Sequence, residues 1–480
     1  MEVCNSGASV SVLCSVFVVS TVVLVMFLNE YSDLRMTLPA PETDRPLSPI
    51  IELQSKVIKS SAQLRSSLSI ESAAPVVKQL RNQTVLAKSM KLRDARPVEQ
   101  GLARARAAIR NAASSRSTVD HNSTDVVPSG VIYRNAGTFY RSYVEMERRL
   151  KVYVYGEGEA PLVHGGPCKN IYSSEGRFIE EMERGDGGRR FRTRDAARAH
   201  LFFMPFSVTW MVKYLYQPNS YDATPLREFV SDYVKVISTK HPFWNSTQGA
   251  DHFMLACHDW GPLASEGNAL LFKTSIRVLC NANTSEGFNP QKDVSLPEIY
   301  LYDGNVSPKL LSLPPARSPR PLLAFFAGGL HGPIRPILLR HWKGRDPDIP
   351  VFEYLPPGLD YYSFMLRSKF CLCPSGHEVA SPRLVEAIYA ECVPVILSDH
   401  SVLPFSDVLR WEEFLVGVEI AEIPRLKEVL TGIPEEKYRR LKVGVRAVRR
   451  HFELNQPPKR FDMFHMILHS VWLRRINLKL

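Results

Sequence analysis

CLCPSGHEVASPRLVEAIYAECVPVIL, residues 371–397, is the stretch that decides the fold class. An apolar run ends in a polar loop, and Ser381-Pro382 then opens a helix with a capping residue followed by proline. A second apolar run, Pro394–Leu397, follows after a short connection. Strand, helix and strand joined by short loops predict a parallel sheet, whose ligands bind at the carboxyl ends of the strands.

The same stretch carries the strongest candidate site. Arg383 falls in the first turn of the predicted helix, and Glu386 lies one turn further along the same face. A helix N-terminus and an arginine suit a phosphate-sized anion, and a nearby carboxylate can accept hydrogen bonds from two vicinal hydroxyls, such as those of a ribose. The spacing therefore indicates a nucleoside diphosphate site. The alternative is a surface ion pair between Arg383 and Glu386.

A second candidate lies in PLLAFFAGGLHGPIRPILLRHW, residues 321–342. Gly328-Gly329 follows an apolar strand and would let the backbone approach a phosphate, and Arg335 on the next helix could supply charge. An ordinary strand–helix turn explains the glycines equally well. The clearest Asp-x-Asp, Asp346-Pro347-Asp348, is interpreted as a turn rather than a metal site.

A third candidate is DHFMLACHDWGP, residues 251–262. His258 and Asp259 follow a predicted strand, where either could act as the general base for a hydroxyl nucleophile. The alternative is a structural histidine with a loop-capping aspartate.

Strand and helix patterns alternate on both sides of the deciding stretch. From 316 to 454, strands are predicted at Leu322–Ala327, Val351–Tyr354, Phe370–Cys373, Pro394–Leu397 and Phe414–Val418. The predicted helices are Ile334–Trp342, Tyr361–Ser368, Pro382–Glu391, Ile423–Leu430, a basic helix at Pro434–Leu454 and an amphipathic one at Phe461–Leu480. From 140 to 315, strands are expected at Lys151–Tyr155, Leu201–Phe206 and Asp251–Cys257, with a helix opened by Thr224-Pro225. The Pro-rich segment 313–321 separates two α/β domains, and 455–480 forms a C-terminal helix.

Composition is that of a globular protein. The 480 residues are 45% hydrophobic and 23% charged, which excludes collagen, a coiled coil and a multi-span membrane protein. The net charge is +11, but residues 51–116 alone hold 13 Lys and Arg against 4 Asp and Glu. Because the basic surplus belongs to one low-complexity segment, we expect a solvated tether there and no nucleic-acid partner.

The N-terminus predicts membrane attachment. Ala8–Leu28 is uncharged and long enough to cross a hydrocarbon core of about 30 Å. We expect a cytosolic tail (1–7), a signal anchor (8–28) and a largely disordered stem (29–139) that carries one helical patch near Leu92–Arg110. Charges flanking the anchor do not support this orientation. Five glycosylation sequons do support a lumenal body, at Asn82, Asn122, Asn245, Asn283 and Asn305.

FFAGGLHGPIRP (325–336), the stretch from Cys371 to Phe405 and the N-terminal anchor resemble the exostosin-type glycosyltransferases, above all the plant members involved in cell-wall polysaccharides. The resemblance covers about Tyr140–Leu454. It implies a GT-B fold of two Rossmann-like domains that face each other across a cleft, and a type II Golgi membrane protein. It also implies inverting transfer from a UDP-sugar, with no tightly bound metal.

On this chain the resemblance assigns Arg383 to the diphosphate and Glu386 to the ribose. It places Gly328, Gly329 and Arg335 on the phosphate side, and Ser375, Gly376 and Ser381 around the donor. Cys371 and Cys392 become a candidate disulfide. The general base stays open between Asp259 and His258.

These observations predict a UDP-sugar-dependent hexosyl- or pentosyltransferase acting on a glycan acceptor, in cell-wall polysaccharide synthesis or protein glycosylation. The alternative function is a non-catalytic scaffold or acceptor-binding subunit of a Golgi transferase complex. The sequence leaves open the donor sugar, the linkage and whether the chain forms homo- or hetero-oligomers.

Overall fold

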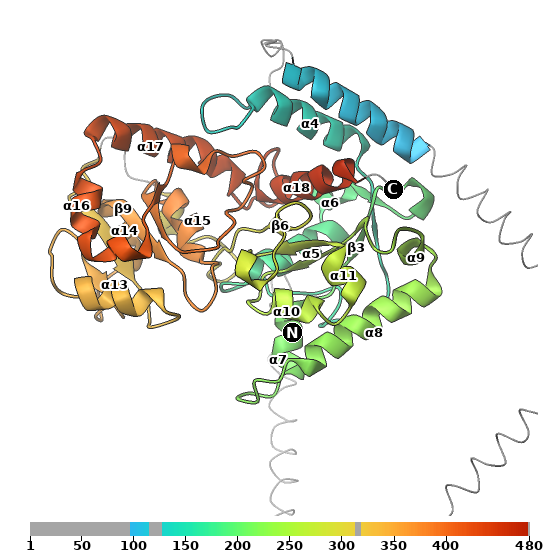
Figure 1. The fold of residues 1–480 in the computed structure, drawn as a ribbon, viewed down its shortest axis with the longest axis horizontal. Helices are drawn as coiled ribbons and strands as arrows, with labels where there is room; N and C mark the ends of the chain where they lie inside the picture. The colour runs from blue at the N-terminus through green and yellow to red at the C-terminus, as the bar shows by residue number, and fades with distance from the viewer. Residues whose placement is uncertain (1–96, 115–126, 313–317, 479–480) are drawn as a thin grey trace, which may run out of the picture. The chain divides into compact units, whose positions relative to one another are not determined.

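The computed structural model describes residues 97–114, 127–312 and 318–478. The predicted tail, the membrane anchor, most of the stem and the sequons at Asn82 and Asn122 lie outside these residues. Within the described ranges, no helix is both long and apolar enough to span a bilayer. Figure 1 shows the described elements as a ribbon from α4 to α18.

Six parallel strands form the N-terminal sheet. Their order is β2 (Arg192–Thr193), β1 (Val152–Val154), β3 (Leu201–Met204), β4 (His252–Ala256), β5 (Ile276–Leu279) and β6 (Val294–Ser295). The central strands β3, β4 and β5 are buried along their whole length, as expected of parallel strands covered on both faces. β1, β3 and β4 lie within the predicted segments, whereas β5 and β6 were not predicted.

Helices follow the strands of this sheet in the expected alternation. They are α5 (Ser173–Glu183), α6 (Asp186–Arg189), α7 (Val208–Leu215), α8 (Thr224–Lys240), α9 (Phe243–Thr247), α10 (Gly261–Ser265), α11 (Ala269–Lys273) and α12 (Pro308–Leu311). The predicted helix at Thr224 is confirmed, but its cap differs from the expected one. Ala223 occupies the N-cap position, and the Asp222 side chain accepts a hydrogen bond from the Thr224 backbone N–H at 2.9 Å.

Five parallel strands form the C-terminal sheet. Their order is β11 (Val416–Gly417), β10 (Val393–Leu397), β9 (Ser368–Pro374), β7 (Leu322–Ala327) and β8 (Val351–Phe352). The accompanying helices are α13 (Ile334–Trp342), α14 (Tyr361–Arg367), α15 (Pro382–Tyr389), α16 (Leu426–Thr431) and α17 (Glu435–Val448). β7 and α13 have the predicted bounds, so the sequence-based α/β assignment is confirmed for this part of the chain.

Both sheets share one strand order, in which the first strand lies between the second and the third. The side on which successive strands are added therefore changes between β7 and β9 in the C-terminal sheet, and between β1 and β3 in the N-terminal sheet. Ligands of such sheets bind beyond the carboxyl ends of the strands at this switch point. The fold thus indicates the loops after β7 and β9 as a site before any side chain is considered.

The last helix, α18 (Met463–Asn477), differs from its prediction as an amphipathic helix. From Met463 to Ile476 every residue except Leu473 is buried. The helix contacts β5 and β6 on one side and α4 (Ala136–Arg149) on another, which leaves it without a polar face. The C-terminal end of the chain therefore completes the core around the N-terminal sheet.

Part of the segment expected to be a stem packs on the folded body. Residues 97–114 are helical and lie beside α4 in Figure 1, and Leu102 and Ala105 on this helix are fully buried. Arg106 donates a hydrogen bond to the Leu478 carbonyl at 2.8 Å, and Glu99 pairs with Arg475 at 2.6 Å. These contacts place one face of the helix at 97–114 against the core that α18 completes.

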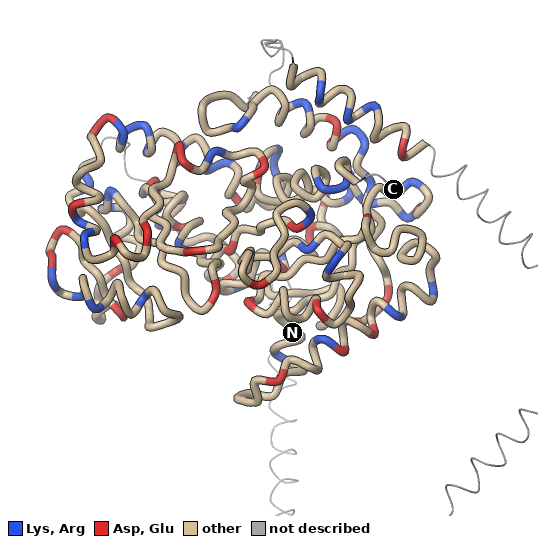
Figure 2. Tube along the Cα trace, in the orientation of Figure 1, with Lys and Arg blue, Asp and Glu red and all other residues tan. Residues whose placement is uncertain are grey.

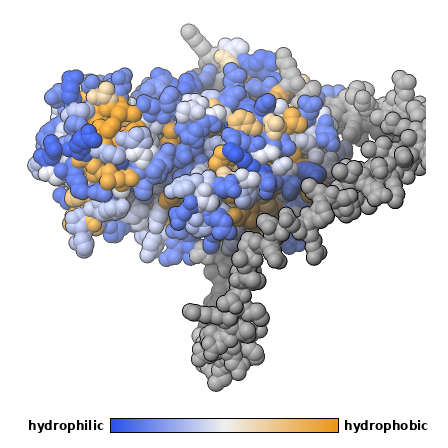
Figure 3. Space-filling model, turned by 60° about the horizontal axis from the view of Figure 1, so that its bottom comes forward, coloured by the Kyte–Doolittle hydropathy of each residue, from blue (hydrophilic) through white to orange (hydrophobic). Residues whose placement is uncertain are grey.

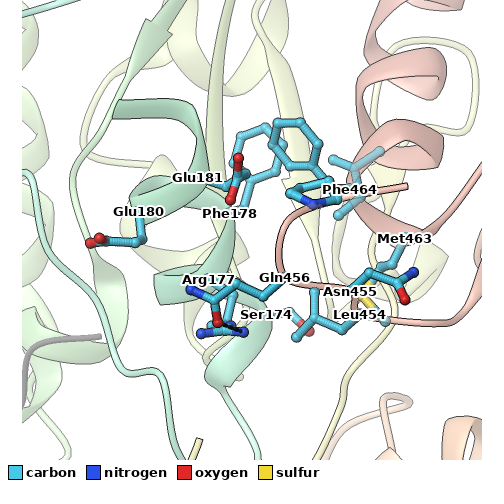
Figure 4. Close-up of a pocket in the computed structure, with 12 residues that line it drawn as sticks. Ser174, Arg177, Phe178, Glu180, Glu181, Leu454, Asn455, Gln456, Met463 and Phe464 are labelled. Carbon is cyan, nitrogen blue, oxygen red and sulfur yellow. Dashed lines mark hydrogen bonds between the residues drawn. The ribbon is translucent and has the colours of Figure 1, made fainter. Parts of the chain in front are cut away.

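Figure 4 shows how the returning chain meets α5. Phe178 of α5 lies 5.5 Å from the ring of Phe464, and Arg177 donates a hydrogen bond to the Gln456 side chain at 2.7 Å. The space between them is only about 20 Å³, which holds one water molecule at most. This hollow is a packing seam rather than a ligand site.

The described surface mixes both signs of charge. Lysine and arginine alternate with aspartate and glutamate over both sheets in Figure 2. The face in Figure 3 carries small separate hydrophobic areas among hydrophilic residues. This pattern is typical of a globular surface, and it agrees with the expectation that the basic surplus belongs to the segment before the body.

Two disulfides join neighbouring strand ends. Cys371 bonds to Cys392, the pair implied by the resemblance, and the bond links β9 to the start of β10. Cys257 bonds to Cys280, which links the ends of β4 and β5 and was not predicted as a pair. Cys373 is a buried free thiol.

Candidate active site

The predicted glycines and serine meet at the switch point of the C-terminal sheet. Gly328 and Gly329 follow β7, and Ser375 and Gly376 follow β9. Gly332, at φ +66°, brings the two loops into contact, because a Cβ there would lie 1.7 Å from the Gly376 carbonyl oxygen. Only glycine fits this position, so the two loops form one continuous backbone surface.

Arg383 is fixed on this surface. Its guanidinium donates to the Ala327 carbonyl at 2.9 Å and to the Ser381 hydroxyl at 3.2 Å, and it lies 5.0 Å from the centre of the Phe326 ring. Ser381 is the N-cap of α15, as predicted, but its hydroxyl serves the arginine instead of the helix backbone. A Cβ on Gly328 would lie 2.3 Å from the Arg383 Nη2 atom, so this glycine makes room for the guanidinium.

Arg335 reaches the same surface from α13. It is 8% exposed and donates to the Gly329 carbonyl at 3.3 Å. Burial, together with the nearby charge of Arg383, lowers the pKa of Arg335 to about 10. Two arginines of like charge therefore share a poorly solvated place, which an anion would stabilise.

Neither arginine has an ion-pair partner among the described residues. No described carboxylate lies within 4.0 Å of either guanidinium, and the Nε atoms of Arg335 and Arg383 are both buried without a hydrogen-bond partner. A buried donor without a partner costs about 1–3 kcal/mol, more when it is charged. The geometry is that of an anion site whose anion is supplied from outside the chain.

Glu386 does not form the surface ion pair that was the alternative interpretation. It is 7% exposed and accepts hydrogen bonds from the hydroxyls of Tyr361 at 3.1 Å and Tyr362 at 3.3 Å. Burial raises the pKa of Glu386, and the charge of Arg383 opposes this effect. The carboxylate is thus oriented by two tyrosines in a buried position.

A cavity of about 750 Å³ opens beside these residues. Its walls come from both halves of the body: Tyr300, Asn305 and Lys309 on one side, and Tyr361, Tyr362, Arg383 and Glu386 on the other. Lys309 pairs with Asp360 across it at 2.8 Å. The volume falls within the range of small-molecule and cofactor sites, so a nucleotide-sized ligand fits it.

The structure separates the two base candidates. The Nδ1 atom of His258 accepts a hydrogen bond from the Trp260 backbone N–H at 3.1 Å, and burial lowers the His258 pKa to about 4. The ring nitrogen that would accept a proton from a substrate therefore already accepts the hydrogen bond from Trp260. Burial raises the pKa of Asp259, which is hydrogen-bonded to the Tyr172 side chain. A carboxylate of raised pKa suits a general base better than the histidine does.

Sequence reasoning missed the acidic groups around Asp259. Asn281 donates from Nδ2 to Glu286 at 2.9 Å and to Glu378 at 2.6 Å, which joins the N-terminal half to the loop after β9. Burial and the charges of Glu286 and Asp259 raise the pKa of Glu378 to about 8. These residues lie almost 100 positions apart along the chain, so no local pattern could have brought them together.

Glu298 was also missed, although it connects the two sides of the site. It is 6% exposed, and burial raises its pKa well above the usual range. The charges of Asp259, Arg383, Glu386 and Arg335 all act on it. Glu298 is therefore a buried acidic group that feels the charges of both the base candidate and the arginines.

The other predicted features are placed as follows. In the described ranges, no group of three or more acidic, histidine or cysteine side chains could hold a metal ion. Asp346-Pro347-Asp348 forms a turn, as interpreted, with Lys427 paired to both aspartates at 2.7 and 2.9 Å. Asn245 and Asn305 are exposed. Asn283 is 8% exposed and donates a hydrogen bond to Glu286 at 2.7 Å.

Two parallel sheets define an α/β protein, and the arginine pair and the cavity at the switch point suit an anionic, nucleotide-sized ligand. The family model "Exostosin GT47 domain" matches residues 146–433. The chain belongs to this glycosyltransferase family, as the sequence motifs indicated.

Similar proteins carry transferase names. A probable glycosyltransferase of Arabidopsis thaliana is 64% identical over 400 residues, covering 83% of this chain and 82% of the relative. A probable glucuronosyltransferase of Oryza sativa subsp. japonica is 28% identical, covering 67% of this chain and 81% of the relative. A probable beta-1,4-xylosyltransferase of Arabidopsis thaliana is 29% identical over the same share of each chain. A glycosyltransferase structure from Rickettsia africae aligns with a TM-score of only 0.32 at 8% identity, over 67% of this chain and 96% of that chain.

Proposed function

We propose that this glycosyltransferase transfers a sugar from a UDP-sugar to a glycan acceptor with inversion at the anomeric carbon. The two sheets act as the halves of a GT-B enzyme, with the acceptor on the N-terminal side and the donor on the C-terminal side. The observation that carries the proposal is the pair of arginines, Arg335 buried and Arg383 half-buried, which has no ion-pair partner among the described residues.

The arginines bind the diphosphate of the donor. The backbone surface formed by Gly328, Gly329 and Gly376 allows phosphate oxygens to approach, and the N-terminus of α15 adds its positive end. Charge builds up on the diphosphate as the bond to the anomeric carbon breaks. Fixed cations in a buried site stabilise that charge more in the transition state than in the ground state.

The cavity beside Arg383 accepts the nucleoside. Glu386 is held by Tyr361 and Tyr362 with its carboxylate at the cavity wall, where it can accept hydrogen bonds from the two ribose hydroxyls. Ser375 follows β9 and Ser381 caps α15, so both belong to the loop that we propose surrounds the donor.

Asp259 is the base that the site supports. It removes the proton from the acceptor hydroxyl, whose oxygen attacks the anomeric carbon from the side opposite the leaving UDP. One carbon–oxygen bond forms as the other breaks, and UDP leaves against Arg335 and Arg383. A raised Asp259 pKa brings the group closer to neutral pH, where proton transfer from a hydroxyl is more favourable.

The proposed setting is the Golgi lumen, with residues 8–28 as the membrane anchor. The disulfides Cys257–Cys280 and Cys371–Cys392 support an oxidising compartment. Relatives named xylosyl- and glucuronosyltransferase support a pentose or uronic-acid donor.

Calorimetric titration with UDP tests the proposal directly. UDP should bind the full chain, and Arg383→Ala or Arg335→Ala should weaken binding at least tenfold. Arg340→Ala is the matched control, since Arg340 lies on the same helix as Arg335 but is exposed. Absence of UDP binding by the folded chain would favour a non-catalytic scaffold.

A further inference from the structure

Two histidines flank the contact between the loops after β7 and β9. His331 directly precedes Gly332, and His377 directly follows Gly376, so each is a neighbour of one of the two glycines whose backbones touch. The two imidazole rings lie 5.4 Å apart, and both residues are exposed. Because the rings come from different loops, the tight contact between the loops is what brings them together. We call His331 and His377 the histidine pair.

The histidine pair borders the same backbone surface as the arginines. The Gly329 carbonyl accepts a hydrogen bond from the His331 backbone N–H at 2.9 Å and another from the Arg335 Nη1 atom at 3.3 Å. A Cβ on Gly329 would lie 3.3 Å from the Nε2 atom of His331. A Cβ on Gly376 would lie 3.0 Å from the Nη2 atom of Arg335 and 3.5 Å from the Cβ of His331. The space that these glycines leave open is therefore bordered by guanidinium and imidazole groups.

Positive charge prevails around His331. Burial and the charges of Arg335, His377 and Arg383 lower the pKa of His331, and the charge of Asp259 acts in the opposite direction. Neither imidazole of the pair forms an ion pair within the described ranges. Without a ligand, the arginines therefore disfavour the protonated form of His331.

The other titratable groups nearby do not supply a counter-charge. Glu378 follows His377 in the chain, but it accepts a hydrogen bond from Asn281 at 2.6 Å, and its pKa is raised to about 8 by burial and by the charges of Glu286 and Asp259. Glu378 is therefore mostly uncharged at neutral pH. The Tyr354 hydroxyl approaches the position of a Gly329 Cβ to 2.8 Å and offers an uncharged hydrogen-bonding group.

We propose that the histidine pair binds the diphosphate of the donor in its protonated form, so that donor binding is coupled to the uptake of protons. A diphosphate on the arginines replaces repulsion at the imidazoles by attraction. The rings then take protons from the solvent and donate N–H groups to phosphate oxygens. This inference rests on the proposed transferase function, and it adds two binding residues and a pH dependence to the donor site.

Donor affinity should rise as the pH falls. The complex holds more protons than the separate chain and donor, so a higher proton concentration favours the complex. The rise should end below the lowered pKa of His331, where the ring is already protonated in the free chain.

Calorimetry on the full chain measures both affinity and proton uptake. UDP-glucose and UDP-xylose are the probes, because UDP alone gains a proton of its own near pH 6 at its terminal phosphate, a group that a UDP-sugar lacks. Titrations at about pH 6 and about pH 8.5 bracket the ordinary histidine pKa. We expect affinity about fivefold tighter or more at the lower pH. Proton uptake, obtained from buffers of different ionisation enthalpy, should be positive at neutral pH.

Matched variants assign the effect to the pair. His331→Gln and His377→Gln should each weaken binding about fivefold near pH 6, reduce the proton uptake, and change affinity little near pH 8.5, where the rings are neutral. A merely structural role would weaken binding equally at both pH values. His341→Gln is the control, because His341 lies in the last turn of α13, at the far end from Arg335. Affinity independent of pH, or unchanged proton uptake in both histidine-pair variants, would overturn the inference.

Arg383→Ala separates this inference from the proposed function. A folded chain that binds neither UDP-sugar at either pH contradicts the proposed function itself. Binding that is weakened in Arg383→Ala, but is the same in both histidine-pair variants, keeps the proposed function and contradicts this inference alone.

Discussion

Gly328→Ala is the substitution whose effect the structure defines most sharply. The new Cβ would lie 2.3 Å from the Nη2 atom of Arg383 and 3.1 Å from the Phe326 ring. An ordinary contact is about 3.5 Å or more, so the guanidinium must move by roughly 1 Å. That shift breaks its 2.9 Å hydrogen bond to the Ala327 carbonyl and displaces the charge from the proposed diphosphate position.

The size of the effect follows from the hydrogen bond to the diphosphate that the displaced guanidinium can no longer make. A hydrogen bond from a charged group contributes about 1.5–3 kcal/mol, which corresponds to a roughly 10- to 150-fold loss of affinity for the anion. Calorimetry with UDP measures this loss, and thermal unfolding checks that the fold is kept. Gly417→Ala is the control, because a Cβ at Gly417 meets nothing within 4 Å. UDP affinity within twofold of the unchanged chain for Gly328→Ala would refute the assignment of Arg383.

Three further predictions concern acid–base chemistry and stability. Because burial raises the pKa of Asp259 and only the carboxylate can accept a proton, kcat/KM should rise with pH through a value above the usual aspartate range. A pH–rate profile checks this, and full activity in Asp259→Asn would contradict it. Arg277→Ala should lower the free energy of unfolding by about 3–5 kcal/mol, because it leaves the fully buried Asp293 with only Lys292 as an ion-pair partner. Urea denaturation measures the loss, and a change below about 1 kcal/mol would refute the reasoning. Removing Cys371–Cys392, which closes a sequence separation of 21, should cost about 3 kcal/mol in the double Cys→Ala variant. The melting temperature should fall accordingly, and an unchanged value would show that the bond adds no stability.

The local pattern was enough to predict the C-terminal sheet. β7 and α13 begin and end where the sequence placed them, since an apolar run, a glycine pair and an amphipathic stretch follow one another there without ambiguity. β5 was missed because Arg277 interrupts its apolar run. Only the structure shows that Asp293 pairs with this arginine inside the core.

α18 shows a different limit of sequence reasoning. Its polar residues, among them His469, Arg474 and Arg475, suggested a solvated face. In the structure they are buried, and they bond to partners far away in the chain: Arg475 to the His200 carbonyl at 2.7 Å, and His469 to the Ser142 hydroxyl at 3.0 Å. A buried polar residue cannot be told from an exposed one until its partner is known.

The candidate site likewise contains residues that local spacing predicts and residues that only the fold brings together. Arg383, Glu386, Gly328 and Arg335 follow strand ends and could be found from spacing alone. Glu298, Glu378 and Asn281 could not, because they act only when the two halves of the body meet.

Donor turnover is the most direct test of the central claim. UDP release and the glycosylated product should be followed with a panel of UDP-sugars and glycan acceptors, using the full chain beside Arg383→Ala and Arg340→Ala. We expect that one UDP-sugar is consumed, that the product has the inverted anomeric configuration, and that Arg383→Ala loses at least tenfold in kcat/KM while Arg340→Ala does not. Turnover that survives in Arg383→Ala, or a product with retained configuration, would contradict it.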